Sequence, residues 1–257
     1  MQLINNSLMK ILAIIPARYH STRLPGKVMR IIEGKTLIQR VYEQVSKCRF
    51  FDQIIVAVDH ELVFEHVAAF GGHAIMTSDN LPSGTDRCAE VARLISGFTH
   101  IVNVQGDEPF IEINTLDQLC HLLDDSKVKI ASLMTPVKDY FELDNPNVVK
   151  VVVGNSMNAL YFSRSAIPFA REINEVERLK FFQYYKHIGL YGFQVETLLE
   201  ISRLPTGTLE KIEMLEQLRW LEAGFHIRMG VIETNGFGID TEEDLKKAEA
   251  RLAINRL

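Results

Sequence analysis

The first half of the chain alternates short apolar runs with stretches of helical periodicity. An apolar run at 10–15 is followed by a segment at 37–45 whose apolar residues recur at the spacing of one helical face, and then by a second run at 54–58. The alternation continues with predicted strands at 73–77 and 100–104 and predicted helices at 61–70, 89–95 and 115–123. This pattern is typical of βαβ units and predicts an α/β fold with a mostly parallel sheet covered by helices. Ligands of such sheets bind at the C-terminal ends of the strands.

The second half of the chain has a different pattern. Residues 148–153 and 157–163 flank a Gly-Asn-Ser turn and predict a β-hairpin, and 186–193 predicts a further strand. Helices at 195–202 and 208–223, a strand at 226–232 and a helix from Thr241 complete the prediction. Because no Pro-, Gly- or Ser-rich linker interrupts the sequence, we expect one α/β domain with an inserted antiparallel subdomain.

The composition limits the partners that the chain can bind. Of its 257 residues, 47% are apolar, and 28 basic against 33 acidic residues give a formal net charge of −5. Without a global positive field we expect neither nucleic acid nor an anionic membrane as a partner. No apolar run reaches the length of about 18 residues needed to span a bilayer, and no signal peptide is recognised. Three widely spaced cysteines fit reduced core thiols, so we expect a cytoplasmic protein.

The segment IIPARYHSTRLPGK at 14–27 joins the end of a predicted buried strand to a basic loop. Arg18, Arg23 and Lys27 are spread over ten residues, too far apart for one compact helical face. A loop that folds back on itself can direct all three cations and its backbone N–H groups at one anion. The segment therefore predicts a polyphosphate site that suits a nucleoside triphosphate.

A carboxylate follows the predicted strand at 100–104. In the sequence QGDEP, Gly106 permits a close backbone approach and Pro109 ends the strand, so Asp107 is presented at the C-terminal edge of the sheet. A nucleotide-bound Mg²⁺ would lie there. An aspartate that only shapes a turn beside Gly106 is the alternative, and the neighbouring basic loop makes it the weaker one.

A second carboxylate, Asp240, directly precedes the last predicted helix. The spacing of Thr241 and Asp244 fits a capping box, and Asp240 could itself be only a capping residue. Protein sites for Mg²⁺ commonly supply one or two carboxylates, while phosphate and water complete the coordination shell. Asp107 and Asp240 are therefore the candidate metal pair, with the capping role of Asp240 left open.

Other polar segments could contribute to a ligand site. Residues 83–87, SGTDR, lie between a predicted strand and a helix, where first-turn N–H groups could face a base or phosphate, although a plain N-cap explains Ser83 or Thr85 as well. In the second half of the chain, segments that combine basic, acidic and uncharged polar residues suit a hydroxylated acidic ligand. On the helix at 208–223, Ile212, Leu215, Leu218 and Leu221 mark the expected core face, so its charged residues could equally be solvated. The P-loop, GxGxxG and GxSxG patterns are absent.

Eight segments together resemble the 3-deoxy-manno-octulosonate (Kdo) cytidylyltransferase family, the CMP-Kdo synthetases of lipopolysaccharide biosynthesis, and the match covers nearly the whole chain. They are IPARYHSTRLPGK, TSDNLPSGTDR, VNVQGDEPFI, NPNVVKVV, ALYFSRSAIPF, KHIGLYGF, LEKIEMLEQLRWL and GIDTEEDL. Sialic-acid cytidylyltransferases share the first and third in looser form, whereas the later segments favour Kdo. The resemblance implies a Rossmann-like nucleotidyltransferase fold, a homodimer, Mg²⁺ dependence, and the reaction of CTP with Kdo to give CMP-Kdo and diphosphate.

The resemblance also implies roles for individual residues. The catalytic set would be Arg18, Lys27, Asp107 and Asp240, with Asp107 and Asp240 as metal ligands. The nucleotide would be held by Arg18, Arg23, Lys27, Ser83, Gly84 and Arg87, and the sugar by Gln105, Arg164, His187, Tyr191, Glu213 and Gln217. Residues of about 10–140 and 225–257 would form the nucleotide and metal core of a single domain spanning 1–257, and about 141–224 a subdomain for sugar binding and dimerisation.

The expected reaction is in-line attack by the anomeric hydroxyl of Kdo on the α-phosphorus of CTP. No general base is evident in the sequence, and a metal-activated hydroxyl is the hypothesis. The alternatives are a cytidylyltransferase for sialic acid or amino-Kdo, a glycosyltransferase that uses a nucleotide sugar, and a non-catalytic nucleotide-binding protein. The glycosyltransferase would be expected to carry a DxD motif, which the sequence Asp107-Glu108-Pro109 does not match.

Overall fold

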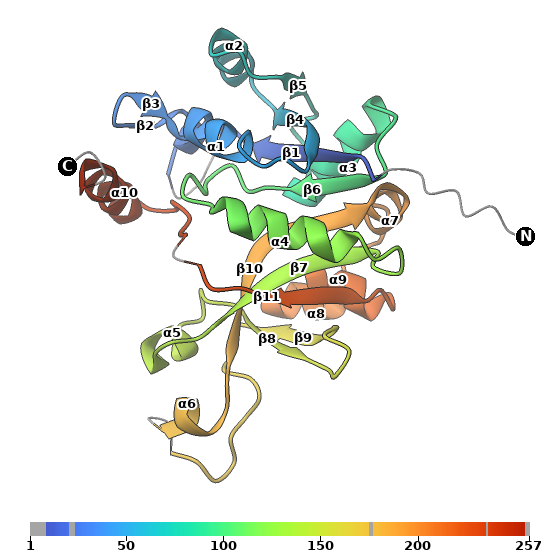
Figure 1. Ribbon diagram of the computed structural model, residues 1–257, viewed down its shortest axis with the longest axis vertical. Coiled ribbons are helices and arrows are strands. Elements are labelled where there is room, and N and C mark those ends of the chain that lie inside the picture. Colours follow the sequence, from blue (N-terminus) through green and yellow to red (C-terminus); the bar gives the residue numbers. More distant parts are fainter. Residues whose placement is uncertain (1–8, 21–23, 175–176, 235, 255–257) are drawn as a thin grey trace, which may run out of the picture. The chain divides into compact units, whose positions relative to one another are not determined.

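The structure is a computed structural model that describes residues 9–20, 24–174, 177–234 and 236–254 (Figure 1). Contacts between Cα atoms divide the chain into two units. Unit 1 comes from residues 1–109 and 237–257, and unit 2 from residues 110–236. Unit 2 is therefore inserted, in sequence, between the two segments of unit 1.

Unit 1 contains a parallel sheet in the order β5-β4-β1-β6. Its strands are β1 (Ile11–Ala17), β4 (Phe51–Val58), β5 (Ala74–Met76) and β6 (His100–Asn103). Ile14 of β1 lies opposite Ile55 of β4 and Asn103 of β6. Every residue from Ile11 to Ile15 is fully buried. A continuous apolar strand of this kind is expected where helices cover both faces of a parallel sheet.

Helices also belong to unit 1, and the first three of them along the chain pack on these strands. They are α1 (Leu37–Val45), α2 (Glu61–Ala69), α3 (Gly84–Leu94) and α10 (Glu242–Ile254). The Thr36 hydroxyl accepts a hydrogen bond from the N–H of Gln39 and starts α1, and the Ser83 hydroxyl does the same for Asp86 and starts α3. The last helix, α10, contacts the small hairpin of β2 (Ile31–Ile32) and β3 (Lys35–Thr36), as Figure 1 shows. The two ends of the sequence therefore complete one unit.

Unit 2 is mainly antiparallel. Its strands are β7 (Ile130–Pro136), β8 (Lys150–Val153), β9 (Ala159–Ser163), β10 (Tyr185–Gln194) and β11 (Ile227–Val231). Strand β7 pairs in parallel with β11 and antiparallel with β10, which also pairs with β8. The predicted hairpin is confirmed, because β8 and β9 pair antiparallel.

The helices of unit 2 are α4 (Ile113–Leu123), α5 (Tyr140–Asp144), α6 (Arg178–Phe181), α7 (Val195–Ile201), α8 (Thr208–Glu213) and α9 (Gln217–Glu222). Helix α4 packs on β7, β10 and β11. A Cβ atom on Gly192 of β10 would lie 2.7 Å from a methyl carbon of Leu123, so a larger residue there would require the Leu123 side chain of α4 to move.

Two parts of unit 2 differ from the sequence prediction. The single helix predicted at 208–223 is wrong, because Met214 has a left-handed backbone (φ 53°) and ends α8. The break turns Ile212 outward, where it is 79% exposed, although Leu215 and Leu218 are buried as expected. Strand β7 was not predicted. Its buried Ser132 and Thr135 interrupt what would otherwise read as an apolar strand.

The predicted fold class is confirmed. A helix-covered parallel sheet forms unit 1, and an antiparallel part is inserted between its two segments.

Candidate active site

The basic loop begins where β1 ends, at the C-terminal edge of the unit 1 sheet. Arg18 follows β1 and donates from Nη2 to the carbonyl oxygen of Leu81, at 2.6 Å. The N–H of Tyr19 donates to Oδ1 of Asp59, at 2.9 Å. Arg23, which the sequence places in the phosphate site, lies outside the described residues. Two hydrogen bonds therefore hold the loop where it leaves the sheet edge, one to the residue directly after β4 and one to the segment before α3.

Lys27 is positioned by a tight turn. Gly26 has φ 63°, a left-handed conformation that glycine adopts without strain, and it precedes a short 3₁₀ helix at Lys27–Met29. The side chain of Lys27 is 12% exposed. This turn brings the last cation of the basic segment back to the sheet edge.

Lys27 bridges the two predicted metal ligands. Its Nζ lies 2.5 Å from Oδ2 of Asp107 and 2.7 Å from Oδ1 of Asp240. Burial disfavours the ammonium, but the charges and hydrogen bonds of the two carboxylates outweigh it and raise the pKa of Lys27. One positive charge thus already lies between two carboxylates that are far apart in the sequence.

The backbone fixes Asp107 at this position. A Cβ atom on Gly106 would lie 2.6 Å from the carbonyl oxygen of Pro16, so only glycine lets the segment after β6 pass so close to the end of β1. The carbonyl of Asp107 accepts a hydrogen bond from the N–H of Ile239, at 2.9 Å, which draws the Asp240 segment alongside. The predicted close approach at Gly106 is confirmed.

The capping interaction at α10 uses the neighbours of Asp240. The Thr241 hydroxyl accepts from the N–H of Asp244 at 3.2 Å, and Oδ2 of Asp244 accepts from the N–H of Thr241 at 3.0 Å, as the capping box predicts. Asp240 donates its own N–H to Asp244 and turns its carboxylate to Lys27. Its side chain is 42% exposed. The alternative that Asp240 only caps the helix is therefore not supported.

A cavity of about 330 Å³ opens at this edge of unit 1. It brings together six of the predicted site residues, Arg18, Lys27, Gly84, Gln105, Asp107 and Asp240, and its remaining lining is Pro16, His20, Val28 and Gly106. Gly84 is the first residue of α3, after the N-cap Ser83.

Arg87 is not in this cavity. It is fully buried, and Nη2 donates to Oδ2 of Asp59 at 3.2 Å while Nη1 donates to the Thr77 hydroxyl. Asp59 also accepts a hydrogen bond from the N–H of Tyr19, so the Arg87–Asp59 pair is connected to the basic loop through Asp59. Arg87 therefore lies outside the lining of this cavity, and its contact with the nucleotide stays a prediction.

Glu108 was not among the predicted site residues, and it does not line the cavity. Burial and, second, the charge of Asp107 raise the pKa of Glu108 to about 7, against the opposing effect of Lys27. In the sequence, only the position next to Asp107 distinguishes Glu108 from other glutamates.

The other five predicted sugar residues belong to unit 2. Arg164 donates from Nε to the carbonyl of Glu213 at 2.7 Å, from Nη1 to that of Pro146 at 2.9 Å and from Nη2 to that of Met214 at 3.2 Å. The Glu213 carboxylate in turn accepts from the N–H of Arg164 and the hydroxyl of Ser163. Arg164 and Glu213 are thus brought together, with the guanidinium bound to three backbone carbonyls.

His187 and Tyr191 also lie together, with ring centroids 5.2 Å apart. His187 Nε2 is 2.9 Å from the Ser132 hydroxyl, and burial lowers the pKa of His187 to about 3. The Tyr191 hydroxyl is buried and has no hydrogen-bond partner among the described residues, and burial raises its pKa well above the usual value. Gln217 is buried at the start of α9.

Two further observations concern the described residues only. The described residues contain no group of three or more His, Cys, Asp or Glu side chains that could hold a metal ion. An ion held by Asp107 and Asp240 would therefore need further ligands from outside the protein's described side chains. The same residues also contain no helix long and apolar enough to cross a bilayer.

Comparisons with known proteins identify the family of the chain. A family model described as cytidylyltransferase matches residues 12–229. The chain is 50% identical over 248 residues to the 3-deoxy-manno-octulosonate cytidylyltransferase of Phocaeicola vulgatus, covering 95% of this chain and 98% of that one. It is 49% identical over 245 residues to the protein of the same name in Bacteroides thetaiotaomicron, covering 94% and 97% of the two chains.

Solved structures show the same relationship. The structure of CMP:2-keto-3-deoxy-manno-octonic acid synthetase complexed with CTP has a TM-score of 0.89 and 39% identity, covering 96% of this chain and 99% of that one. The 4-diphosphocytidyl-2C-methyl-D-erythritol synthase of Anaerococcus prevotii is 15% identical with a TM-score of 0.62, covering 95% and 99%, and shows a shared fold.

The fold and the matches to known proteins are thus those of a nucleotidyltransferase. The chain belongs to the cytidylyltransferase family and, within it, to the 3-deoxy-manno-octulosonate cytidylyltransferases.

Proposed function

We propose that the unit 1 cavity is the site at which this enzyme joins CTP to Kdo, giving CMP-Kdo and diphosphate. The observation that carries the assignment is the contact of Lys27 with both Asp107 and Asp240 inside a cavity that also contains Arg18. Cations beside paired carboxylates suit a triphosphate that arrives with a divalent ion. The relatives' names favour Kdo over sialic acid or amino-Kdo as the acceptor.

The donor set fits Mg²⁺. Asp107 and Asp240 offer hard oxygen ligands, their side chains are 27% and 42% exposed, and they already share one cation in Lys27. These two residues would hold the ion, and the phosphates of the nucleotide would complete its ligands. When bound, the ion would neutralise charge on phosphate oxygens.

The chain's own groups then have separate tasks. Arg18 and Lys27 bind the β- and γ-phosphates and stabilise the negative charge that develops on the diphosphate. The Kdo hydroxyl oxygen forms the new bond to the α-phosphorus as the bond to the bridging oxygen of diphosphate breaks, and the hydroxyl proton is lost. That proton passes to solvent water, since Glu108, the carboxyl group next to Asp107 in the chain, does not line the cavity.

Sugar selection falls to the predicted residues Gln105, Arg164, His187, Tyr191, Glu213 and Gln217. A hydroxylated acid needs hydrogen-bond donors. We expect these to be the buried Tyr191 hydroxyl, which has no partner among the described residues, and the N–H hydrogens of Arg164 Nη1 and Nη2 that do not bond to backbone carbonyls. The family resemblance supports a homodimer that acts in the cytoplasm, and light scattering during size-exclusion chromatography measures the dimer directly.

A diphosphate-release assay tests the proposal. CTP, UTP and ATP are each combined with Kdo or with sialic acid in the presence of MgCl₂. We expect release with CTP and Kdo at a rate at least about a hundredfold above every other pair, since differential binding of this size requires only about 2.7 kcal/mol. Equal rates with sialic acid, or CTP binding without release, would reject the proposed reaction.

A further inference from the structure

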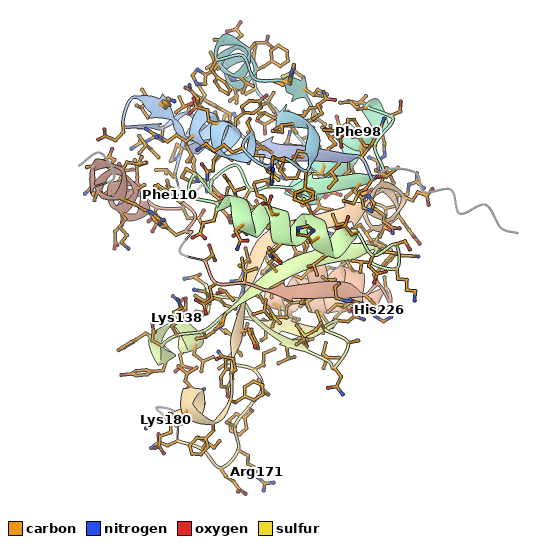
Figure 2. The ribbon with its side chains drawn as sticks, viewed as in Figure 1. Phe98, Phe110, Lys138, Arg171, Lys180 and His226 are labelled. Carbon is orange, nitrogen blue, oxygen red and sulfur yellow. The ribbon has the colours of Figure 1, made fainter. Side chains whose placement is uncertain are left out.

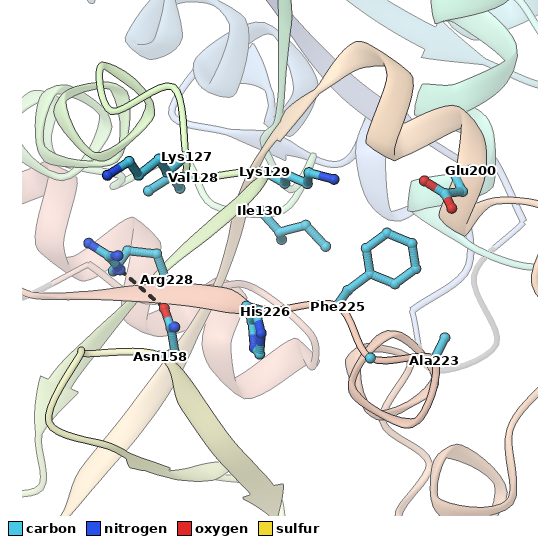
Figure 3. Close-up of a pocket in the computed structure, with 11 residues that line it drawn as sticks. Lys127, Val128, Lys129, Ile130, Asn158, Glu200, Ala223, Phe225, His226 and Arg228 are labelled. Atoms are coloured by element: carbon cyan, nitrogen blue, oxygen red, sulfur yellow. Dashed lines mark hydrogen bonds between the residues drawn. The ribbon is translucent and has the colours of Figure 1, made fainter.

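Unit 2 contains a second cavity, of about 430 Å³, that shares no residue with the unit 1 cavity. Its walls come from the start of β7, the β8–β9 hairpin, α7 and the segment from α9 into β11 (Figure 3). The lining is Lys127, Val128, Lys129, Ile130, Asn158, Glu200, Ala223, Gly224, Phe225, His226 and Arg228.

The charge of this cavity is positive in a chain that is negative as a whole. Lys127, Lys129 and Arg228 face a single carboxylate, that of Glu200, whereas the formal net charge of the protein is −5. In the described part of the chain the ammonium groups of Lys127 and Lys129 form no ion pair. Figure 3 shows the ends of Lys127 and Arg228 on the same side of the cavity, away from Glu200, and an anion bound there would relieve the repulsion between like charges.

Arg228 and Asn158 are oriented by each other. Nε of Arg228 donates to Oδ1 of Asn158 at 3.1 Å. This bond uses the Asn158 acceptor and only one of the Arg228 nitrogens, so the Asn158 amide N–H groups and both Nη groups of Arg228 remain as donors among the described residues. Donors fixed in this way match the oxygens of a phosphate group.

The backbone around Asn158 is also unusual. Met157 has φ 59°, a left-handed conformation that few non-glycine residues adopt, and its carbonyl accepts from the N–H of Met229 at 2.8 Å. Asn158 and Arg228 form an isolated antiparallel bridge. The hairpin is therefore tied to β11 at the point where Asn158 enters the cavity.

The other side of the cavity carries an aromatic ring beside a carboxylate. Figure 3 shows Lys127 and Arg228 on one side, with the Phe225 ring and Glu200 on the other. Val128 and Ile130 add apolar surface, and Phe225 is held by its N–H bond to the carbonyl of Trp220, at 3.0 Å. Gly224, with φ +83°, makes the turn that presents Phe225. A flat ring can therefore lie on Phe225 while an anionic group reaches Arg228.

We propose that this unit 2 cavity binds a small phosphomonoester that carries a flat apolar group. The phosphate is held by Lys127, Arg228 and the Asn158 amide, and the flat group lies against Phe225. A cavity of about 430 Å³ has room for a ligand of this size. The site is independent of the proposed catalytic residues.

Phenyl phosphate is the probe, titrated by calorimetry into the full-length protein in the presence of saturating CTP, so that the unit 1 cavity is filled. We expect saturable binding that is weakened at least tenfold by the double substitution Lys127→Gln and Arg228→Gln. Inorganic phosphate, which lacks the ring, is expected to bind more weakly than phenyl phosphate to the wild type. Absence of saturable phenyl phosphate binding to the wild type overturns the proposal, as does binding that the double substitution leaves unchanged.

Two controls separate the site from charge alone and from misfolding. The double substitution Lys138→Gln and Arg171→Gln removes the same charges from exposed positions of unit 2 that lie away from His226 in Figure 2, and it is expected to leave binding unchanged. Asn158→Asp keeps the acceptor for Arg228 but replaces the amide donor with a negative charge, so binding falls although the Arg228 bond can still form. Phe225→Ala is expected to weaken phenyl phosphate at least threefold and to leave inorganic phosphate unaffected. Equal loss in the Lys138/Arg171 control overturns the proposal.

Discussion

Nζ of Lys27 lies 2.7 Å from Oδ1 of Asp240, although 213 positions separate the two residues in the sequence. The same ammonium contacts Asp107, so the start and the end of unit 1 meet around one charge. This contact gives the basic segment after β1 a specific place beside two carboxylates. It also means that the lysine holds, before any ligand binds, a position between groups that suit a divalent ion.

Replacing Lys27 with Met removes the cation between Asp107 and Asp240. The two carboxylates then repel each other, so the thermal midpoint falls, and MgCl₂ without nucleotide restores part of it because the ion takes the place of the ammonium. We expect MgCl₂ to raise the midpoint of the variant by about 3 °C more than that of the wild type. Scanning calorimetry at matched ionic strength, with NaCl as the control, measures this difference. An equal response of the two proteins contradicts a shared cation position.

Gly106→Ala places a methyl group where the structure has no space. The new Cβ atom would lie 2.6 Å from the backbone oxygen of Pro16, which cannot move away as a flexible side chain could. We expect a loss of about 2–3 kcal/mol in the free energy of unfolding, measured with urea. Gly154→Ala is the matched control, since its Cβ would make ordinary contacts at 3.5 Å, and its effect should be within about 0.5 kcal/mol.

Arg87→Met breaks the buried pair with Asp59 and leaves a carboxylate without its partner. Because Arg87 is fully buried, the main effect is a loss of about 3–5 kcal/mol of stability. Chemical denaturation measures it, and Arg49→Gln at an exposed position serves as the control. A variant of wild-type stability with a raised KM for CTP would instead support the original reading of Arg87 as a nucleotide contact.

Protonation of His187 couples stability to pH. Burial lowers its folded pKa to about 3, against about 6.5 in the unfolded chain, so the unfolded state takes up the proton first as the pH falls. The stability contribution is present above pH 6.5 and is lost progressively below it, by about 2 kcal/mol at pH 5. His187→Gln should remove this part of the pH dependence, whereas His73→Gln, at an exposed position, should keep it. Identical pH profiles for wild type and His187→Gln would show that His187 does not titrate in this way.

Much of unit 1 follows from local patterns in the sequence. The buried run of β1, the N-cap at Ser83 and the close approach at Gly106 all leave local signals, and each is found where the pattern allows it. The contact of Lys27 with two distant carboxylates is different, because it depends on how the segments meet. The sequence predicted which residues belong near the phosphate and metal sites, but the contact between them is visible only in the folded structure.

Unit 2 was harder to predict because its decisive features are not periodic. The break at Met214 has no glycine or proline to announce it, and the helical pattern runs across it without interruption. Strand β7 contains Ser132, a polar residue that can be buried because its hydroxyl donates a hydrogen bond to the carbonyl of Leu190.

Arg87, in unit 1, also has a feature that the sequence does not reveal. The family resemblance implies a contact with the nucleotide, and only the fold reveals its partner Asp59.

Asp240→Asn provides the most direct measurement of the central claim, which is that Asp107, Asp240 and Lys27 form the catalytic centre. The rate of diphosphate release from CTP and Kdo is measured across a series of MgCl₂ concentrations, beside Asp244→Asn as a control that alters the cap of α10 and keeps one side-chain oxygen as an acceptor for the Asp240 N–H. We predict that Asp240→Asn lowers kcat at least about a hundredfold and weakens the apparent affinity for Mg²⁺, while Asp244→Asn stays within about threefold of the wild type. A wild-type rate and a wild-type MgCl₂ dependence in Asp240→Asn would contradict the account.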